Sequence, residues 1–400
     1  MFYLLPPAGT SISLKNMLDI VYQLIKLKSY KRAFTERIVA LSEAEHCLLL
    51  NHGRSALYMI LKSLSAISDP GKNEVIMPAY TCYSVAAAVA KANLKINLID
   101  IDPTTLDYDY DLLKNADMSR VLAIIGCNLF GIMNDWTRLR SIASQCKAYL
   151  IDDAAQSMGS VLDDRVSGIQ GDVGFFSMGR GKNLSAYSGG ILVTNNGEIA
   201  NQLALMASSL DKPNLIGECG DLIKLFLMGF LQKPRLYWFP AMLPFLGLGK
   251  TEYDDEYYVG LMSSVQECAG YVLIDNLAGI NDIRKKNAEA IAKGLLKNDR
   301  ISIPGYTAGN CPIYVRLPVL VQDRIARDRA VSALRRKGIS ASPMYPSIIS
   351  HIHGINGHLT TTDRDFPEAQ LIVERLLSIP THPYVRNRDI QCIIGHFSEE

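Results

Sequence analysis

Short runs rich in valine and isoleucine alternate with longer helix-like segments between Glu74 and Asn195, and this alternation constrains the fold more than any other feature. The apolar runs occupy residues 74–78, 95–102, 120–126, 148–153 and 190–195. Strands that alternate with helices form β-α-β units, in which the strands run parallel. The sequence therefore predicts an α/β domain with a mixed, mostly parallel sheet.

The chain has 400 residues, enough for two or three domains with a sizeable core. Residues 15–28 repeat apolar side chains as an amphipathic helix does, and residues 263–298 predict one long helical stretch with its glycines as kink points. After Pro304, an apolar strand, a charged helix, a loop and a final helix from about Phe366 predict a smaller α+β domain. We therefore divide the chain into an arm (1–35), a large domain (36–262), a connecting helix (263–298) and a small domain (299–400).

The charge balance argues against a polyanionic partner. Lysine and arginine number 41 against 40 acidic residues, which gives a net charge of +1. Nucleic-acid-binding proteins usually carry a clear basic excess. We therefore expect no nucleic-acid partner, and the 48% apolar and 20% charged residues are typical of a soluble globular protein.

Cysteine and histidine patterns predict neither a metal site nor a disulfide framework. The eight cysteines include no CxxC pair, so we expect reduced thiols. His351, His353 and His358 lie in a loop that contains glycine and asparagine, which favours a solvated or substrate-facing loop. The amino-terminal apolar run stops at Pro6 and has no basic residues before it, unlike a secretory signal. We expect a cytoplasmic protein.

Three segments of the large domain indicate one cofactor when they are taken together. A turn at Gly53 leads directly into a helix, whose free N–H groups can bind a phosphate. Asp152 and Asp153 end an apolar strand, where ligands of α/β sheets gather. Lys182 lies among small residues between two apolar strands, an unusual place for an uncommitted charge. Each feature alone also fits a turn, a cap or a solvated lysine, but pyridoxal phosphate (PLP) would use all three.

The same residues carry a family resemblance. The motifs GRSAL (53–57), PAYT (78–81), IDDAAQ (151–156), GFFSMGRGKNL (174–184) and FPEAQLIVERLLSIPTHP (366–383) follow one another in the chain. In this order the sequence resembles the DegT/DnrJ/EryC1/StrS family of sugar aminotransferases, from about residue 40 to the carboxyl end. The resemblance implies the type I PLP-dependent transferase fold, the fold of aspartate aminotransferase.

The resemblance also implies roles for five residues around the cofactor ring and phosphate. Lys182 matches the lysine that bonds the cofactor aldehyde and moves the proton during the reaction. Asp153 matches the partner of the pyridine nitrogen, and Asp152 is expected to lie outside direct contact. Gln156 matches the side chain beside the phenolic oxygen, and Ser177 matches a serine that binds the phosphate.

The expected phosphate turn departs from the family pattern. Arg54 and Ser55 follow Gly53 where the family usually has Thr-Ala, and residues 257–261 lack the Asn and Arg with which the family reaches the neighbouring subunit's phosphate. The inter-subunit contact is therefore in doubt. Arg54 or Arg180 is the expected replacement for the missing positive charge, because a guanidinium pairs well with phosphate oxygens.

A second departure concerns the face of the cofactor ring. Cys82 occupies the position of the aromatic residue that covers the ring in the family, so either Tyr80 or Tyr83 is a candidate substitute. Tyr345, in a loop that approaches the active site in the family, and Arg180 are expected substrate contacts. Arg316 is a candidate for the donor carboxylate, although its place on a predicted strand favours simple exposure.

A lysine at position 182 favours transamination over the dehydratase branch of the family, in which a histidine replaces it. The resemblance implies a homodimer that moves an amino group, from glutamate in most relatives, to a keto-sugar nucleotide in surface polysaccharide or related glycan synthesis. As a base Lys182 must be neutral, and partial burial would lower its pKa. The alternatives are an aminotransferase for a lipid-linked or non-sugar ketone and a non-catalytic regulatory or scaffold protein.

An apolar insertion at 221–253 is the part that the resemblance explains least. From residue 222 to residue 250 it has four basic residues and no acidic one. Its longest uncharged run, 236–249, is shorter than the ~20 residues of a membrane-spanning helix. Three interpretations stay open: a buried dimerisation element, an interfacial segment that touches anionic lipid, or a lid over the substrate.

Overall fold

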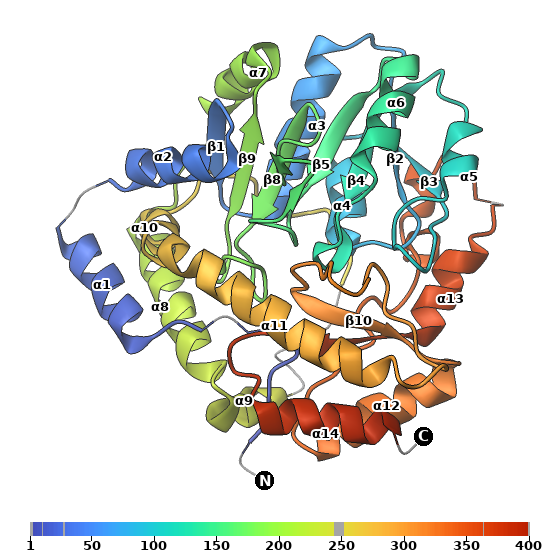
Figure 1. Ribbon diagram of the computed structural model, residues 1–400. Helices are drawn as coiled ribbons and strands as arrows, with labels where there is room; N and C mark the ends of the chain where they lie inside the picture. Colours follow the sequence, from blue (N-terminus) through green and yellow to red (C-terminus); the bar gives the residue numbers. More distant parts are fainter. Residues whose placement is uncertain (1–2, 10, 27–28, 244–251, 363, 399–400) are drawn as a thin grey trace.

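The computed structural model describes residues 3–9, 11–26, 29–243, 252–362 and 364–398. Its centre is a seven-stranded sheet in the order β1-β9-β8-β5-β4-β2-β3 (Figure 1). In chain order these strands are β1 (His46–Leu50), β2 (Glu74–Pro78), β3 (Lys95–Ile99), β4 (Val121–Cys127), β5 (Tyr149–Asp153), β8 (Val173–Ser177) and β9 (Gly190–Thr194). Neighbours from β8 to β3 run parallel, and β9 runs antiparallel to β8 and β1. The predicted mixed, mostly parallel sheet is confirmed.

Helices cover both faces of this sheet. The large-domain helices are α2 (Lys31–Ser42), α3 (Gly53–Ile67), α4 (Tyr83–Lys91), α5 (Tyr110–Lys114), α6 (Trp136–Cys146) and α7 (Gly197–Ala207). On β9, Leu192 packs into the core on the side of α3, whereas Ile191 and Val193 pack into the core on the side of α2. Because both faces are covered, every residue of β4 is buried, as expected of a central parallel strand.

The small domain has more elements than the sequence predicted. Two antiparallel strands, β10 (Arg316–Leu320) and β11 (Leu376–Pro380), are accompanied by helices α12 (Arg324–Arg336), α13 (Pro367–Arg375) and α14 (Asn387–Ser398). The predicted final helix from about residue 366 therefore ends at Arg375, and the chain turns directly into β11. The apolar run from Leu376 to Pro380 pairs with β10, and this tertiary pairing overrides the helical pattern.

The predicted connecting helix is divided into two. Helix α10 (Ser264–Leu273) and helix α11 (Leu277–Leu295) are separated by a 3-10 turn at Ile274–Asn276, which contains no glycine. The expected kink at a glycine is therefore wrong. Gly270 serves close packing instead, because a Cβ there would lie 2.4 Å from the ring of Phe34.

The first residues lie against the small domain and the insertion. Leu5 pairs with Ile339, and the N–H of Leu4 donates to the carbonyl of Pro234. The amphipathic helix predicted at 15–28 is present as α1 (Leu14–Ile25), although residues 27 and 28 lie outside the described residues. The arm boundary predicted at residue 35 falls inside α2, which packs on α10 and β1.

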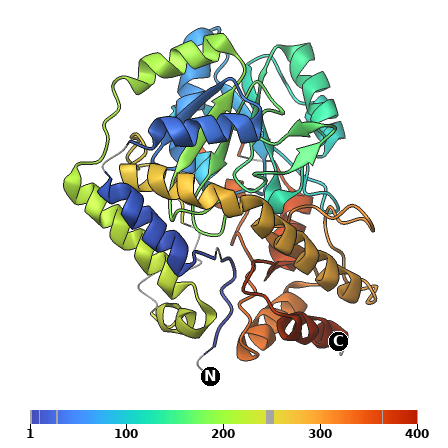
Figure 2. The same cartoon turned by 60° about the vertical axis from the view of Figure 1, so that its left-hand side comes forward.

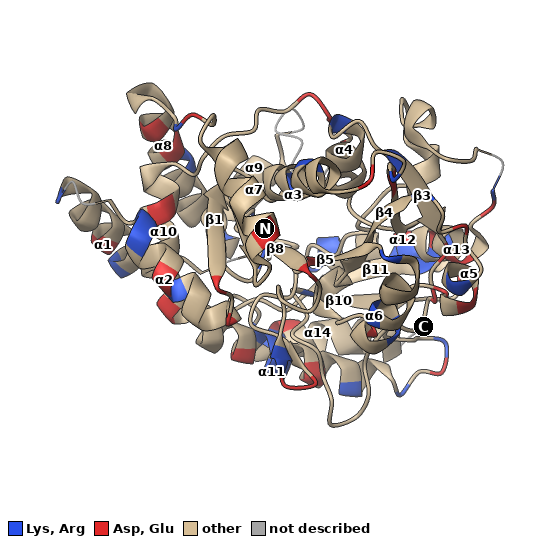
Figure 3. Cartoon of the chain, turned by 90° about the horizontal axis from the view of Figure 1, so that it is seen from above, with Lys and Arg blue, Asp and Glu red and all other residues tan. Residues whose placement is uncertain are grey.

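The insertion contributes residues 221–231 of helix α8 (Leu215–Leu231) and all of helix α9 (Pro234–Ala241). A short hairpin of β6 (Val161–Leu162) and β7 (Arg165–Val166) lies elsewhere on the surface. Helices α8 and α1 lie side by side (Figure 2), and a Cβ at Gly229 of α8 would lie 1.9 Å from the methyl of Met17. Within the described ranges, no helix is long and apolar enough to cross a membrane. Basic and acidic residues are interspersed on the outer helices (Figure 3).

Candidate functional site

The candidate site lies where the parallel strands β4, β5 and β8 end. Cys127 and Asp153 are paired in register at the ends of β4 and β5, and β8 ends at Ser177 beside them. The loop from Met178 to Gly189, which joins β8 to β9, contains Lys182. Carboxyl ends of parallel strands meet at one edge of a sheet, where ligands of α/β proteins bind.

Lys182 is half-buried in this loop, and burial lowers its pKa. The nearby Asp153 and Cys82 act in the opposite direction. The preceding Gly181 has φ +76°, and a Cβ there would lie 2.4 Å from the Cβ of Ala8, so only glycine fits. Backbone geometry therefore requires the glycine that precedes Lys182.

The two adjacent aspartates have different surroundings. Asp153 is buried, its Oδ1 accepts from the N–H of Ala155 at 3.1 Å, and burial raises its pKa while Lys182 lowers it. Asp152 is fully buried and accepts from Asn128 Nδ2 at 2.8 Å and from the N–H of Gly168 at 2.5 Å. Burial raises the pKa of Asp152 to about 7. Asp153 is the carboxylate on the side of Lys182, and Asp152 anchors the loop after β7.

Gly53, Ser55 and Ser177 form a cradle at the start of α3. A Cβ at Gly53 would lie 2.9 Å from the Cβ of Ser177, so glycine is required for this approach. The preceding His52 makes no side-chain cap, which leaves the first N–H groups of the helix for another acceptor. The hydroxyl of Ser55 is fully buried and has no hydrogen-bond partner among the residues that the structure describes. These donors fit a phosphate group.

The side chain of Arg54 is engaged outside this cradle. Its guanidinium pairs with Asp254 at 2.9 Å and lies 4.2 Å from the ring centroid of Tyr257, whose hydroxyl donates to the carbonyl of Arg54. The structure therefore pairs the Arg54 side chain with Asp254, and its predicted role as the positive charge for the phosphate stays a prediction. At the start of α3, the backbone N–H of Arg54 remains available to a phosphate.

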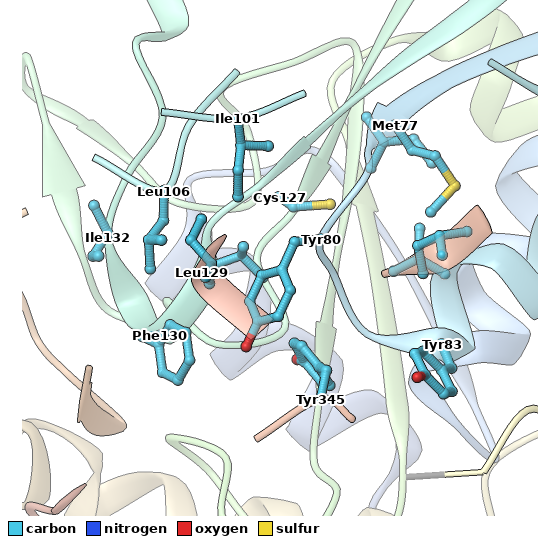
Figure 4. Packing of buried hydrophobic residues seen from close by; sticks show 14 of the residues in the cluster. Met77, Tyr80, Tyr83, Ile101, Leu106, Cys127, Leu129, Phe130, Ile132 and Tyr345 are labelled. Atoms are coloured by element: carbon cyan, nitrogen blue, oxygen red, sulfur yellow. The ribbon is translucent and has the colours of Figure 1, made fainter. Parts of the chain in front are cut away.

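Three tyrosines line the next part of the site. Figure 4 shows Tyr80, Tyr83 and Tyr345 gathered at the edge of the large-domain core. The ring centroid of Tyr345 lies 5.3 Å from that of Tyr80 and 6.5 Å from that of Tyr83. Its hydroxyl lies 3.5 Å from Nε2 of Gln156, so the structure brings these two predicted residues together. Cys82 caps α4 beside them and accepts from the hydroxyl of Ser84 at 3.0 Å.

A cavity of about 830 Å³ opens from the cradle. Arg180 and Arg316 both line it. The sequence favoured an exposed Arg316, but the residue is half-buried, and burial lowers its pKa. The strand β10 turns this side chain toward Gly181, so Arg316 belongs to the site.

Sequence reasoning missed several residues of the site. The cavity is also lined by Pro7 and Ala8 from the amino-terminal segment and by His52 beside Gly53. Burial lowers the pKa of His52 to about 4, and its Nδ1 lies 2.5 Å from the hydroxyl of Ser188. The position of His52 directly before the glycine turn was the sequence feature that could have identified it.

Arg284 was missed as well. It is fully buried on α11, and its Nη2 donates to the carbonyl of Lys182 at 3.0 Å. It occupies a core-facing position of that helix, between Ile280 and Ala288. A charged residue at an apolar position of the helical repeat was the signal that could have revealed it.

The histidine loop shows no ligand geometry. His351 and His358 lie on separate 3-10 turns, Ile349–His351 and Asn356–His358, and His351 and His353 are exposed. Within the described part of the chain, no group of three His, Cys, Asp or Glu side chains is arranged to hold a metal ion.

Comparisons with known proteins agree with this geometry. The model of the DegT/DnrJ/EryC1/StrS aminotransferase family matches residues 21–398. A UDP-N-acetyl-3-dehydro-alpha-D-glucosamine 3-aminotransferase of Acidithiobacillus ferrooxidans is 26% identical over 90% of this chain and 85% of its own. A "pleiotropic regulatory protein" of Geobacillus stearothermophilus is 25% identical over 93% of this chain and 90% of its own.

A solved structure supports the fold. Helicobacter pylori PseC, described as an aminotransferase involved in the biosynthesis of pseudoaminic acid, matches 99% of this chain and 98% of its own with a TM-score of 0.79 at 14% identity. The family match covers the strand ends, the Lys182 loop and both domains. The chain therefore belongs to the DegT/DnrJ/EryC1/StrS family, a family of PLP-dependent aminotransferases.

Proposed function

We propose that this protein transfers an amino group from glutamate to the keto group of a nucleotide-linked sugar, in the synthesis of a surface polysaccharide or related glycan. The observation that carries the proposal is the convergence of Lys182, Asp153 and the Gly53–Ser55–Ser177 cradle at one sheet edge. The amine, the carboxylate and the phosphate donors are the three groups that PLP requires. The membership of an aminotransferase family supports the same reaction.

The cofactor would be held by residues already in place. Ser55, Ser177 and the first N–H groups of α3 would bind its phosphate, and Asp153 would keep its pyridine nitrogen protonated. When bound, PLP supplies an electron sink for negative charge on the substrate carbon. Gln156, which lies near Tyr345, would border the phenolic oxygen.

Lys182 would move the proton at the substrate carbon. A lysine must be neutral to accept a proton, and burial lowers the pKa of Lys182, which favours the neutral amine. Arg316 would bind a carboxylate of the donor, since its guanidinium lines the cavity and its recorded polar contact is Met344 Sδ at 3.3 Å.

The test begins with the cofactor. The purified protein should show the visible absorbance of bound PLP, and Lys182→Ala should abolish it, whereas the exposed Lys297→Ala should leave it unchanged. Glutamate should then bleach the band in the absence of an acceptor. A colourless protein that does not take up PLP would contradict the proposal and favour a regulatory protein, the description carried by one relative.

The acceptor is tested with a panel of keto-sugar nucleotides. Amination of at least one of them with glutamate is expected, and mass spectrometry of the product identifies the sugar. If glutamate bleaches the band but no nucleotide-linked sugar restores it, the acceptor is a different ketone, such as a lipid-linked sugar.

We also propose a homodimer. Large apolar side chains are exposed on α1 and α8, with Leu18 at 61% and Ile216 at 82%, and a second subunit would cover them. Light scattering should give a mass of twice 44.2 kDa. A monomer that co-sediments with anionic vesicles would instead support membrane contact through the insertion.

A further inference from the structure

One face of α8 lines the cavity. Lys224, Leu227, Met228 and Leu231 all border it, and their spacing of three, four and seven residues places them on a single helical face. Helix α9 adds Tyr237 and Pro240. The insertion is therefore a wall of the substrate cavity, which is the lid interpretation among the three that the sequence left open.

The charged residues that line the cavity are all basic. Its described lining residues include three cationic side chains, Arg180, Lys224 and Arg316, and no aspartate or glutamate. Asp221, one turn before Lys224 and 3.4 Å from its Nζ, lies outside this lining. Arg180 lines the cavity and is exposed, and among the described residues it makes no ion pair. Arg180 and Arg316 fit an anionic ligand, and Lys224 would have to exchange its pairing with Asp221 for such a ligand.

The cavity is large enough to hold more than the amino-acid donor. A volume of about 830 Å³ is in the upper part of the range for small-molecule sites, roughly 300–1,000 Å³. The reacting carbon must meet Lys182, which is not itself among the lining residues but follows Gly179 and Arg180, which are. Arg316, which also lines the cavity, suffices for a donor carboxylate. The α8–α9 wall is left for the part of the acceptor that lies away from its keto group.

We infer that α8 and α9 form the acceptor-binding wall, and that Lys224 and Tyr237, with Arg180, bind the diphosphate that links the keto-sugar to its carrier. This inference rests on the proposed function. The ammonium and the phenol donate to diphosphate oxygens, while Leu227, Leu231 and Pro240 contact the adjoining carrier. A nucleoside and an isoprenoid carrier share this diphosphate chemistry.

The experiment measures binding of two probes to the PLP-loaded protein by calorimetry. Uridine diphosphate represents a nucleoside carrier, and farnesyl diphosphate represents a lipid carrier. Trp238 on α9 is one of only two tryptophans, and the other, Trp136, is buried at the start of α6. Trp238 lies outside the cavity lining, so a change in tryptophan fluorescence that Trp238→Phe removes would report a response of α9 to the probe.

The decisive variant is Lys224→Met, with Lys233→Met as its control. Both changes remove one positive charge from the insertion, but Lys233 lies 5.0 Å from the ring of Phe230 and outside the cavity lining. Lys224→Met should weaken binding of the preferred probe about tenfold, and Tyr237→Phe about threefold, because charge-assisted hydrogen bonds are the stronger ones. Lys233→Met should bind as the wild type does.

Each result of these binding measurements either supports or contradicts the inference. Binding of uridine diphosphate alone or farnesyl diphosphate alone, with the expected loss in Lys224→Met, supports the inference and identifies the carrier. If neither probe binds, or if both lysine variants behave alike, the inference is wrong. The bleaching of wild-type holoenzyme by glutamate is recorded separately, so a failure of the proposed reaction is distinguished from a failure of the wall. Thermal melts of each variant exclude loss of folding.

Discussion

Asp152 and Asp153 show how strand geometry separates two identical side chains. Successive residues of a strand point to opposite faces of the sheet. Asp152 therefore meets the N–H groups of Gly168 and Gln170, whereas Asp153 lies on the side of Lys182. One carboxylate holds a loop, and the other is available to a cofactor.

Asp153→Asn tests this separation. The amide keeps a carbonyl oxygen for the N–H of Ala155 but removes the charge beside the expected pyridine nitrogen. The glutamate half-reaction, followed by absorbance, should slow by about 100-fold or more, while PLP is still bound. Asp117→Asn, at an exposed position, is the control. A half-reaction of wild-type speed in Asp153→Asn would exclude the role given to Asp153.

At the scale of elements, the start of α3 and the loop after β8 meet through Gly53 and Ser177. The close approach leaves no room for a side chain at the first position of the helix. Helix α7 also starts with a glycine, Gly197, but no atom lies within 4 Å of the Cβ that would be added there. The two helix starts also differ in their caps, since the Asn196 side chain accepts from the first N–H groups of α7, whereas His52 makes no side-chain cap at α3.

Gly53→Ala and Gly197→Ala are therefore a matched pair. The first places a methyl group 2.9 Å from the Cβ of Ser177, which must open the phosphate cradle. We expect the PLP affinity of Gly53→Ala to fall by about tenfold or more, measured by titration of the apo form, because the phosphate loses its aligned N–H donors. Equal affinities for the two variants would exclude a phosphate site at this helix.

At the scale of the whole molecule, the segment from Tyr3 to Ala8 contacts both the insertion and the small domain. Nε2 of the fully buried His382 donates to the carbonyl of Pro6 at 2.8 Å, and the hydroxyl of Tyr3 donates to Asp389 at 3.2 Å. Pro7 and Ala8 then border the cavity. The amino-terminal segment thus joins the domains at the site itself.

His382 makes this junction sensitive to acid. Burial lowers its pKa from 6.5 to about 4, so the unfolded chain binds the proton more readily than the folded one between these values. The contribution of the neutral imidazole is therefore present above pH 6.5 and is lost as the pH falls toward 4, by at most about 1.4 kcal/mol per pH unit. His382→Gln keeps a donor for Pro6 but does not titrate. The stability gap between wild type and variant, from denaturant unfolding, should shrink between pH 6.5 and 4.5; a constant gap would contradict this.

The sequence predicted local features well. The Val and Ile runs reported the strands, because central parallel strands are buried on both faces and carry little else. Gly53, the pair Asp152–Asp153 and Lys182 were indicated by their local context, whereas Ser177 and the choice of Asp153 came from the family resemblance. Their meeting at one sheet edge follows from the chain order of strands and helices.

The tertiary structure alone decided the rest. Arg284, Arg316 and Lys224 lie on a helix, a strand and an insertion whose local patterns do not indicate a cavity, and only packing turns them toward it or toward Lys182. Likewise, Asp254 engages Arg54 from 200 positions away. Periodicity determines which face of an element is apolar, but the partner of each face is set by long-range packing. The sequence therefore determined which side chains can act, and the tertiary structure decided that residues of the insertion line the cavity beside them, because the partner of each apolar face is set by long-range packing.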